Sequence, residues 1–151
     1  MTPKKQPQIN RDPELLNPRF LAKVTRALHE AEALGYPVRV FEGYRSALRQ
    51  DWLFDQGRGS VGTIVTKAKG WQSTHQYGLA VDIAFYINGR WTWDGAFDKV
   101  AAIFQPCGLV WGGSGDGGHF EMTGGLTVKE CEMITKTHGL LELWRMLHGK
   151  T

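Results

Sequence analysis

Residues 79–93 read LAVDIAFYINGRWTW, and this run predicts a β-hairpin. Through residues 79–86 large apolar residues alternate with small or polar ones, which is the period-two pattern of a strand that buries one face. Asn88-Gly89 then supplies a tight turn, because both residues tolerate the positive φ angles that a two-residue hairpin loop needs. Arg90 to Trp93 is expected to return as the partner strand.

Helical patterns lie on both sides of this hairpin. Asn17-Pro18 places a cap residue and a proline where a helix begins, and apolar residues follow at three- and four-residue steps until Gly35. Further helices are predicted over 47–56 and 96–104, and a capping box at Thr127 opens a helical region near the end of the chain. The Gly-, Lys- and Ser-rich residues 57–74 predict a long surface loop.

Short strands are expected around Val38, around Val110 and over residues 119–122. The predicted fold class is therefore α+β, a small antiparallel sheet with helices packed on it. With 151 residues and no linker or repeat, the chain is expected to form one domain over 1–151. Residues 1–16 are expected to be a flexible or loosely packed N-terminal segment.

Composition excludes several classes of protein. Hydrophobic residues make up 42% and charged residues 22%, which argues against a disordered or fibrous chain. No apolar run approaches the ~18 residues of a membrane span, and the first ten residues lack the apolar stretch of a secretory signal, so a cytoplasmic chain is expected. The net charge of +3 would favour a polyanionic partner. Because the basic residues are scattered without interleaved aromatic residues, nucleic acid is not the expected partner.

Three residues are candidate metal ligands: His75, Asp82 and His119. The spacing of His75 and Asp82 puts them on opposite faces of a continuous strand and about 10 Å apart along a helix, so neither element lets them share a metal. Gly78 lies between them and allows the chain to fold back, which predicts a turn there. Two imidazoles and one carboxylate with an open position form the ligand set of catalytic zinc.

Asp82 lies in the middle of an apolar strand and needs a partner. Burying its charge unpaired would cost several kcal/mol, so a metal, an arginine or donated hydrogen bonds must satisfy it. Arg45 is the alternative partner, and the residues alone leave both readings open. On the later strand His119 and Glu121 share one face, and Asp116, three residues before His119, offers another carboxylate.

The segment STHQYGLAVD at 73–82 resembles the SxHxxGxAxD signature of the M15 peptidases, which include D-alanyl-D-alanine carboxypeptidases and L-alanyl-D-glutamate endopeptidases. DGGH at 116–119 is similar to the second motif of this family, an acidic residue three positions before a histidine. GYRS at 43–46 resembles its upstream arginine segment, and WGG at 111–113 is similar to a stretch of the phage endolysin and spore-wall branch. The resemblance covers about residues 38–122 and implies a Hedgehog/DD-peptidase-like fold.

Position by position, the resemblance implies three zinc ligands, a general base and two residues that bind substrate. They are His75, Asp82 and His119, then Asp116, then Arg45 and Ser73. Arg45 would also act in catalysis by stabilising the carbonyl oxygen of the substrate. Glu121 is a rival base, but we expect it to orient a zinc ligand from behind, as carboxylates at metal sites often do.

The function implied is that of a zinc-dependent peptidoglycan hydrolase, which cleaves the L-alanyl-D-glutamate bond of stem peptides as an endolysin does. Its partners would be peptidoglycan stem peptides, with no membrane anchor, and a monomer is expected. It would remain in the cytoplasm until a separate pore released it to the cell wall. The alternatives are a D-alanyl-D-alanine carboxypeptidase or dipeptidase of the same family, and a non-catalytic zinc-binding module. Trp91 and Trp93 share a strand face and could stack on glycan or pack in the hairpin.

Overall fold

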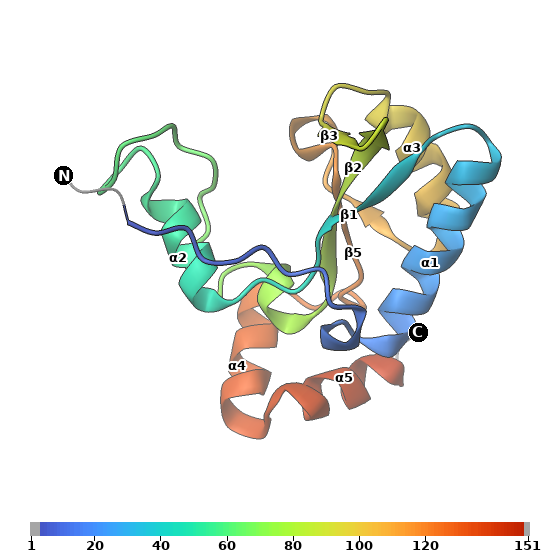
Figure 1. The fold of residues 1–151 in the computed structure, drawn as a ribbon. Helices are drawn as coiled ribbons and strands as arrows, with labels where there is room; N and C mark the ends of the chain where they lie inside the picture. The colour runs from blue at the N-terminus through green and yellow to red at the C-terminus, as the bar shows by residue number, and fades with distance from the viewer. Residues whose placement is uncertain (1–3, 150–151) are drawn as a thin grey trace.

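The predicted hairpin lies at the centre of an antiparallel sheet in the computed structural model, which describes residues 4–149 (Figure 1). The long central strand β2 has β1 on one side and β5 on the other, with β4 outside β5, while β3 pairs with the far end of β2. The bounds are β1 Val38–Glu42, β2 Ala80–Ile87, β3 Arg90–Thr92, β4 Val110–Trp111 and β5 His119–Glu121. The predicted α+β class with a small antiparallel sheet is thus confirmed.

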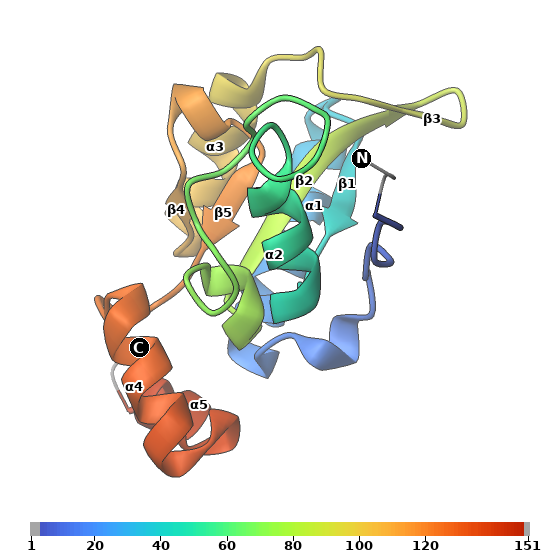
Figure 2. The same cartoon turned by 90° about the vertical axis from the view of Figure 1, so that its left-hand side faces the viewer.

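Helices cover both faces of this sheet. Figure 2 shows α2 in front of the sheet and α1 behind it, and α3 lies beside α1. Helices α4 and α5 form a separate pair at the end of the chain. The helices are α1 Pro18–Ala33, α2 Ala47–Asp55, α3 Phe97–Phe104, α4 Val128–His138 and α5 Leu140–His148, and the short 3-10 helices are η1 Pro13–Leu15, η2 Thr74–Tyr77, η3 Gln105–Cys107 and η4 Ser114–Asp116.

The alternation of β2 separates the core from the site. Val81, Ile83 and Phe85 face α1 and α3 in the main apolar cluster. The other face carries Asp82 toward α2, because successive side chains of a strand point to opposite sides. A smaller apolar cluster around Leu143 holds α4 and α5 against η2.

Residues 4–16 make specific contacts with the rest of the fold. The Gly43 N–H donates to Asn10 O at 2.9 Å, and Trp52 Nε1 donates to Lys4 O at 3.1 Å. Leu16 is only 3% exposed and belongs to the main core. None of the helices within residues 4–149 has the length and apolarity that crossing a bilayer requires.

Candidate functional site

Glu42, Asp82 and His119 lie in one row across three neighbouring strands. In the register of the sheet, Asp82 pairs with His119 of β5 on one side and with Glu42 of β1 on the other. A register shift between Val40 and Glu42 leaves Phe41 as the extra residue of a bulge, and a bulge re-aims the side chains that follow it. Because residues paired across strands point to the same face, the row presents its polar side chains together.

His75 reaches this row from the short helix η2. Gly78 lies at the predicted turn and ends the helix in the left-handed conformation, with φ +66°, and a Cβ there would lie 2.9 Å from Trp144 Cζ2. Trp144 Nε1 donates to Tyr77 O at 2.8 Å, and the Asn17 N–H donates to Gly78 O at 2.9 Å. The turn that carries His75 is therefore fixed to α5 and to the start of α1.

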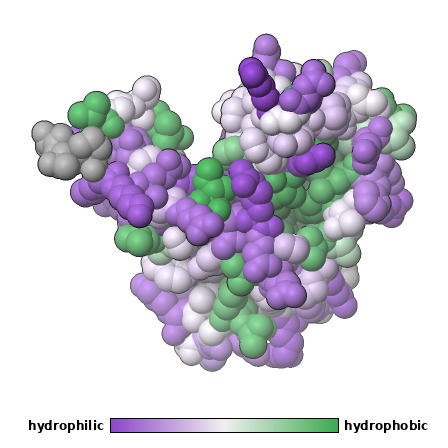
Figure 3. Space-filling model, in the orientation of Figure 1, coloured by the Kyte–Doolittle hydropathy of each residue, from purple (hydrophilic) through white to green (hydrophobic). Residues whose placement is uncertain are grey.

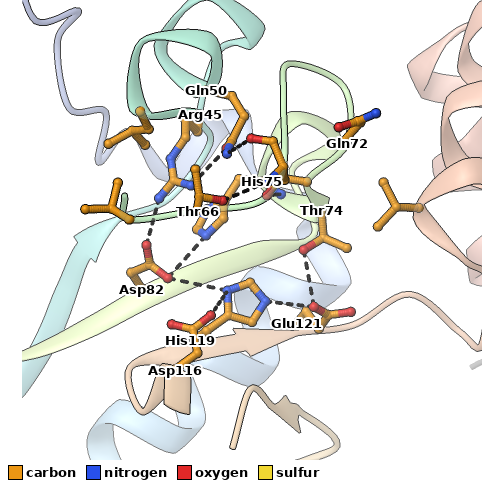
Figure 4. Close-up of a pocket in the computed structure, with 15 residues that line it drawn as sticks. Arg45, Gln50, Thr66, Gln72, Thr74, His75, Asp82, Asp116, His119 and Glu121 are labelled. Atoms are coloured by element: carbon orange, nitrogen blue, oxygen red, sulfur yellow. Dashed lines mark hydrogen bonds and ion pairs between the residues drawn. The ribbon is translucent and has the colours of Figure 1, made fainter. Parts of the chain in front are cut away.

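The three candidate ligands converge, as Figure 4 shows. One nitrogen of His75, one of His119 and one carboxylate oxygen of Asp82 all lie within 4.8 Å of one another. His75 Nε2 lies 3.2 Å from Asp82 Oδ1, and His119 Nδ1 lies 3.4 Å from the same oxygen. Within residues 4–149 this is the single group of His, Cys, Asp and Glu residues with such geometry.

The second ring nitrogen of each histidine has a partner behind the cluster. His75 Nδ1 lies 2.8 Å from Gly43 O, and because a carbonyl can only accept, this nitrogen carries the proton. His119 Nε2 lies 2.7 Å from Glu121 Oε1, which also accepts the Thr74 hydroxyl at 3.3 Å. These hydrogen bonds turn His75 Nε2 and His119 Nδ1 toward Asp82, as the hydrogen-bonded second nitrogen of a metal-binding histidine does.

The charges of the cluster fit a bound cation. Desolvation alone would lower the pKa of His119, but hydrogen bonds with Asp82 and Glu121 raise it to about 10. Desolvation would raise the pKa of Asp82, yet His75, His119 and Arg45 together hold it well below its usual range. The cluster thus stabilises positive charge next to the ionised carboxylate of Asp82. Two imidazole nitrogens and a carboxylate oxygen are donors that suit a divalent transition metal in the same position.

Arg45 holds the other oxygen of Asp82. Its Nη2 donates to Asp82 Oδ2 at 2.8 Å and to Glu42 Oε1 at 2.9 Å, while its Nη1 donates to Gln50 Oε1 at 3.0 Å. Arg49 Nε donates to Glu42 Oε2 at 2.5 Å. The sequence left a metal and Arg45 open as partners of Asp82. Both can bind it, because Arg45 donates to Oδ2 while Oδ1 faces the two imidazoles. Sequence reasoning missed Glu42, although its position at the end of a strand, just before Arg45, was a usable signal.

Replacing the buried Glu42 should destabilise the fold strongly. The Glu42 side chain is 2% exposed and is the shared acceptor of two arginines, so Glu42→Gln leaves Arg49 without its counter-charge and Arg45 with Asp82 alone. Removing one partner of a buried ion pair typically costs about 3–5 kcal/mol. Urea unfolding in the presence of a chelator should show this loss, whereas Glu32→Gln, at an exposed position of α1, should change the free energy of unfolding by less than about 0.5 kcal/mol.

The same contacts give a pH dependence. Burial would raise the pKa of Glu42, but the hydrogen bonds from Arg49 and Arg45 outweigh it and hold the pKa below its usual 4.5. A lowered pKa in the folded state contributes stability above pH 4.5 that is lost as the pH falls through the folded-state value. Stability should therefore fall less steeply in acid for Glu42→Gln than for the wild type, and parallel curves would contradict this role.

A cavity of about 380 Å³ opens over the ligand cluster. Gln50 of α2 and Thr66 of the long loop line one wall, while His119 and Asp116 line the other (Figure 4). In the space-filling view the surface is hollowed between α2 with its following loop and the part of the molecule that carries β3 (Figure 3). The loop over 57–74, predicted to be a surface loop, thus helps to enclose the cluster.

Asp116 lies at the rim of this cavity. Its Oδ2 is 4.0 Å from His119 Nδ1, and 67% of its side chain is exposed. Desolvation raises the pKa of Asp116, and while His119 opposes the increase, the charge of Asp82 adds to it. A carboxylate with a raised pKa beside a candidate metal position can accept a proton from a water molecule held there.

Ser73 also lines the cavity, but its hydroxyl has a structural partner. Ser73 Oγ accepts the His75 N–H at 3.3 Å, and the Ser73 N–H donates to Gln76 Oε1 at 3.0 Å, so the two residues form a capping box for η2. The structure therefore brings together every predicted site residue: Arg45, Ser73, His75, Asp82, Asp116, His119 and Glu121.

Comparisons with known proteins find similarity to peptidases. Residues 66–122 match the family model of the M15 peptidases that is described as D-alanyl-D-alanine carboxypeptidase. The peptidoglycan L-alanyl-D-glutamate endopeptidase CwlK of Bacillus subtilis is 40% identical over 90 residues, which cover 52% of this chain and 54% of that protein. This chain thus spans about half the length of that curated relative.

A solved structure resembles about three quarters of this chain. The L-Ala D-Glu endopeptidase ChiX of Serratia marcescens superposes with a TM-score of 0.54 at 27% sequence identity. The match covers 74% of this chain and 83% of that one, so it extends beyond the residues that carry the ligand motifs.

Proposed function

Because this chain carries an M15 peptidase domain, we propose that it is a metal-dependent peptidoglycan hydrolase that cleaves the L-alanyl-D-glutamate bond of stem peptides. The observation that carries the proposal is the convergence of three ligand atoms within 4.8 Å of one another, beside a carboxylate at the rim of a cavity. The names of the relatives from Bacillus and Serratia support the choice of bond.

The metal in this proposal is zinc. His75 Nε2, Asp82 Oδ1 and His119 Nδ1 would hold it, and three protein ligands leave the open position that catalytic zinc sites keep. When bound, zinc polarises a carbonyl group and lowers the pKa of a water molecule toward about 7.

Asp116 is the proposed general base. Its carboxylate faces His119 Nδ1 from the rim of the cavity, where a water molecule and the substrate carbonyl would enter. It would accept the proton of the attacking water and pass it to the leaving amine of the D-glutamate residue. Its raised pKa brings the carboxyl closer to the pH at which it must both accept and release a proton.

Two charged residues position the ligands in this proposal. Glu121 fixes the ring of His119 through Nε2 and does not face the shared centre, which favours an orienting role over that of base. Arg45 orients Asp82 through Oδ2 and lines the cavity, where its guanidinium would stabilise the carbonyl oxygen of the substrate. Ser73 would contact the substrate from the same wall.

Mass spectrometry of fragments released from purified sacculi tests the proposal. Incubation with the protein should release fragments with new D-glutamate amino termini, and a chelator should stop the release until zinc is added back. Cleavage that persists in the chelator would remove the metal from the mechanism.

The product also separates this proposal from its alternatives. The description of the family model favours a D-alanyl-D-alanine carboxypeptidase as second candidate, and that enzyme would release D-alanine instead. A protein that binds zinc but releases nothing would be a non-catalytic module. The endolysin role, with release through a separate pore, stays a prediction.

A further inference from the structure

A second cavity, of about 490 Å³, adjoins the first at Asp116, which lines both. Aromatic side chains form one part of its wall, and polar groups with glycines form the other. Its lining includes Trp93, Phe97, Asp98, Trp111, Ser114 and Gly118. Nothing in the proposed hydrolysis uses this cavity apart from Asp116.

Trp93 forms an aromatic platform in this cavity. Its side chain is 51% exposed, yet the ring is held between Phe97, stacked at 6.3 Å and 25°, and Phe41, edge-on at 5.0 Å. Trp91, by contrast, packs in the hairpin against Phe41 and Tyr86, with ring centres at 5.2 and 5.0 Å. Of the two tryptophans that could stack on glycan, Trp93 is therefore the one with the more exposed side chain.

The Trp93 side chain packs against the residue that precedes β5, the strand that carries the candidate metal ligand His119. A Cβ on Gly118 would lie 2.9 Å from Trp93 Cζ3 and 2.4 Å from Ile83 O, so a glycine is needed for the indole to lie there. Gly118 directly precedes His119 in β5. Trp111 Nε1 donates to Gly117 O at 2.8 Å and holds the same stretch from the other side. The position of Trp93 relative to the ligand cluster is thus set by the backbone.

The polar groups of this cavity suit a neutral, hydroxyl-rich ligand. Asp98 and Asp116 offer acceptors and Ser114 offers a hydroxyl, while no Lys, Arg or His among residues 4–149 lines the cavity, which disfavours an anion. A sugar ring has an apolar face of C–H groups that stacks on an indole, and hydroxyls at its edge that donate to carboxylates. An exposed, immobilised tryptophan flanked by acceptors has the chemistry that recognises such a ring.

We propose that this cavity binds the sugar ring to which the stem peptide is attached, with Trp93 as the stacking platform. The inference rests on the proposed function. In peptidoglycan the L-alanine is joined through a lactyl group to an amino sugar, so one amino acid separates the scissile bond from the glycan. A substrate whose scissile bond lies beside Asp116 in the first cavity therefore brings its sugar within reach of the second.

Two matched substrates test this site. One is a disaccharide that carries the stem peptide, and the other is the same peptide without sugar. The wild type should cleave the sugar-bearing substrate with a kcat/KM roughly five- to tenfold higher, which is the size of one stacking contact. In Trp93→Ala this ratio should fall toward one, and Trp93→Phe should restore part of it. Trp52→Ala, which removes a partly exposed indole from α2, should keep the ratio of the wild type.

A titration that needs no cleavage provides the second measurement. A neutral disaccharide of N-acetylglucosamine should change the tryptophan fluorescence of the wild type and of Trp52→Ala but not that of Trp93→Ala. If the wild type cleaves both substrates equally well and the disaccharide has no effect, the sugar site is wrong and the proposed hydrolysis stands. If neither substrate is cleaved, the proposed hydrolysis fails, and the titration alone decides whether the cavity binds sugar.

Discussion

His119→Ala should abolish tight zinc binding and, with it, hydrolysis. His119 supplies Nδ1, one of the three atoms that converge within 4.8 Å, and its removal leaves only His75 and Asp82. Loss of a residue that hydrogen-bonds a metal ligand typically lowers the metal affinity about 10–100-fold. Loss of the ligand itself should therefore lower the zinc affinity by more than about 100-fold. Competition with a chelating dye measures the affinity, and sacculi measure the activity.

His138→Ala is the matched control for this variant. His138 is exposed at the end of α4 and does not line the cavity, so its loss should leave both zinc affinity and hydrolysis as in the wild type. Circular dichroism should show that the two variants are folded alike. A folded His119→Ala protein that binds zinc as tightly as the wild type would overturn the assigned ligand set.

Asp116→Ala should reduce kcat by about 10²–10⁴-fold while zinc remains bound, which is the usual contribution of a general base. Asp116 lies 4.0 Å from His119 and is 67% exposed, so its removal disturbs neither the sheet nor the ligands. Steady-state hydrolysis at saturating zinc, together with metal analysis of the purified variant, separates loss of the base from loss of the metal.

Two further variants make this result specific. Asp94→Ala removes an exposed carboxylate that lines neither cavity and should keep the activity of the wild type. Glu121→Ala should lower zinc affinity by about 10–100-fold and recover activity when zinc is saturating, because Glu121 contacts His119 from behind. Near-normal turnover in Asp116→Ala, with none in Glu121→Ala at saturating zinc, would reverse the two roles.

The period-two pattern of β2 allowed much of this site to be predicted from sequence. Side chains alternate along a strand whatever its neighbours are, so the placement of Asp82 opposite the core and of His119 with Glu121 on one face did not depend on the rest of the fold. The register confirms it, since Asp82 pairs with His119 and Ala80 with Glu121. The turn at Gly78 was predictable for a similar reason, because no regular element could bring His75 to Asp82.

The pairing of β1 with β2 could not be predicted in the same way. Glu42 lies beside Asp82 because Phe41 forms a bulge, and a shift by one residue would have sent Glu42 to the opposite face. That register depends on contacts between segments 40 residues apart in the sequence, such as Glu42 and Asp82. The ion pairs of Glu42 with Arg45 and Arg49 therefore emerged only from the structure.

The contacts around Gly78 make the end of the chain part of the metal site, although no residue of α5 lines the cavity. Trp144 of α5 donates to the carbonyl of Tyr77, two residues after His75, and its ring lies where any larger residue than Gly78 would have to fit. Detachment of α5 would therefore release the imidazole of His75 from its position beside Asp82. On heating, α5 should therefore detach and the proposed zinc should be lost in a single transition, at a lower temperature than that at which the sheet unfolds.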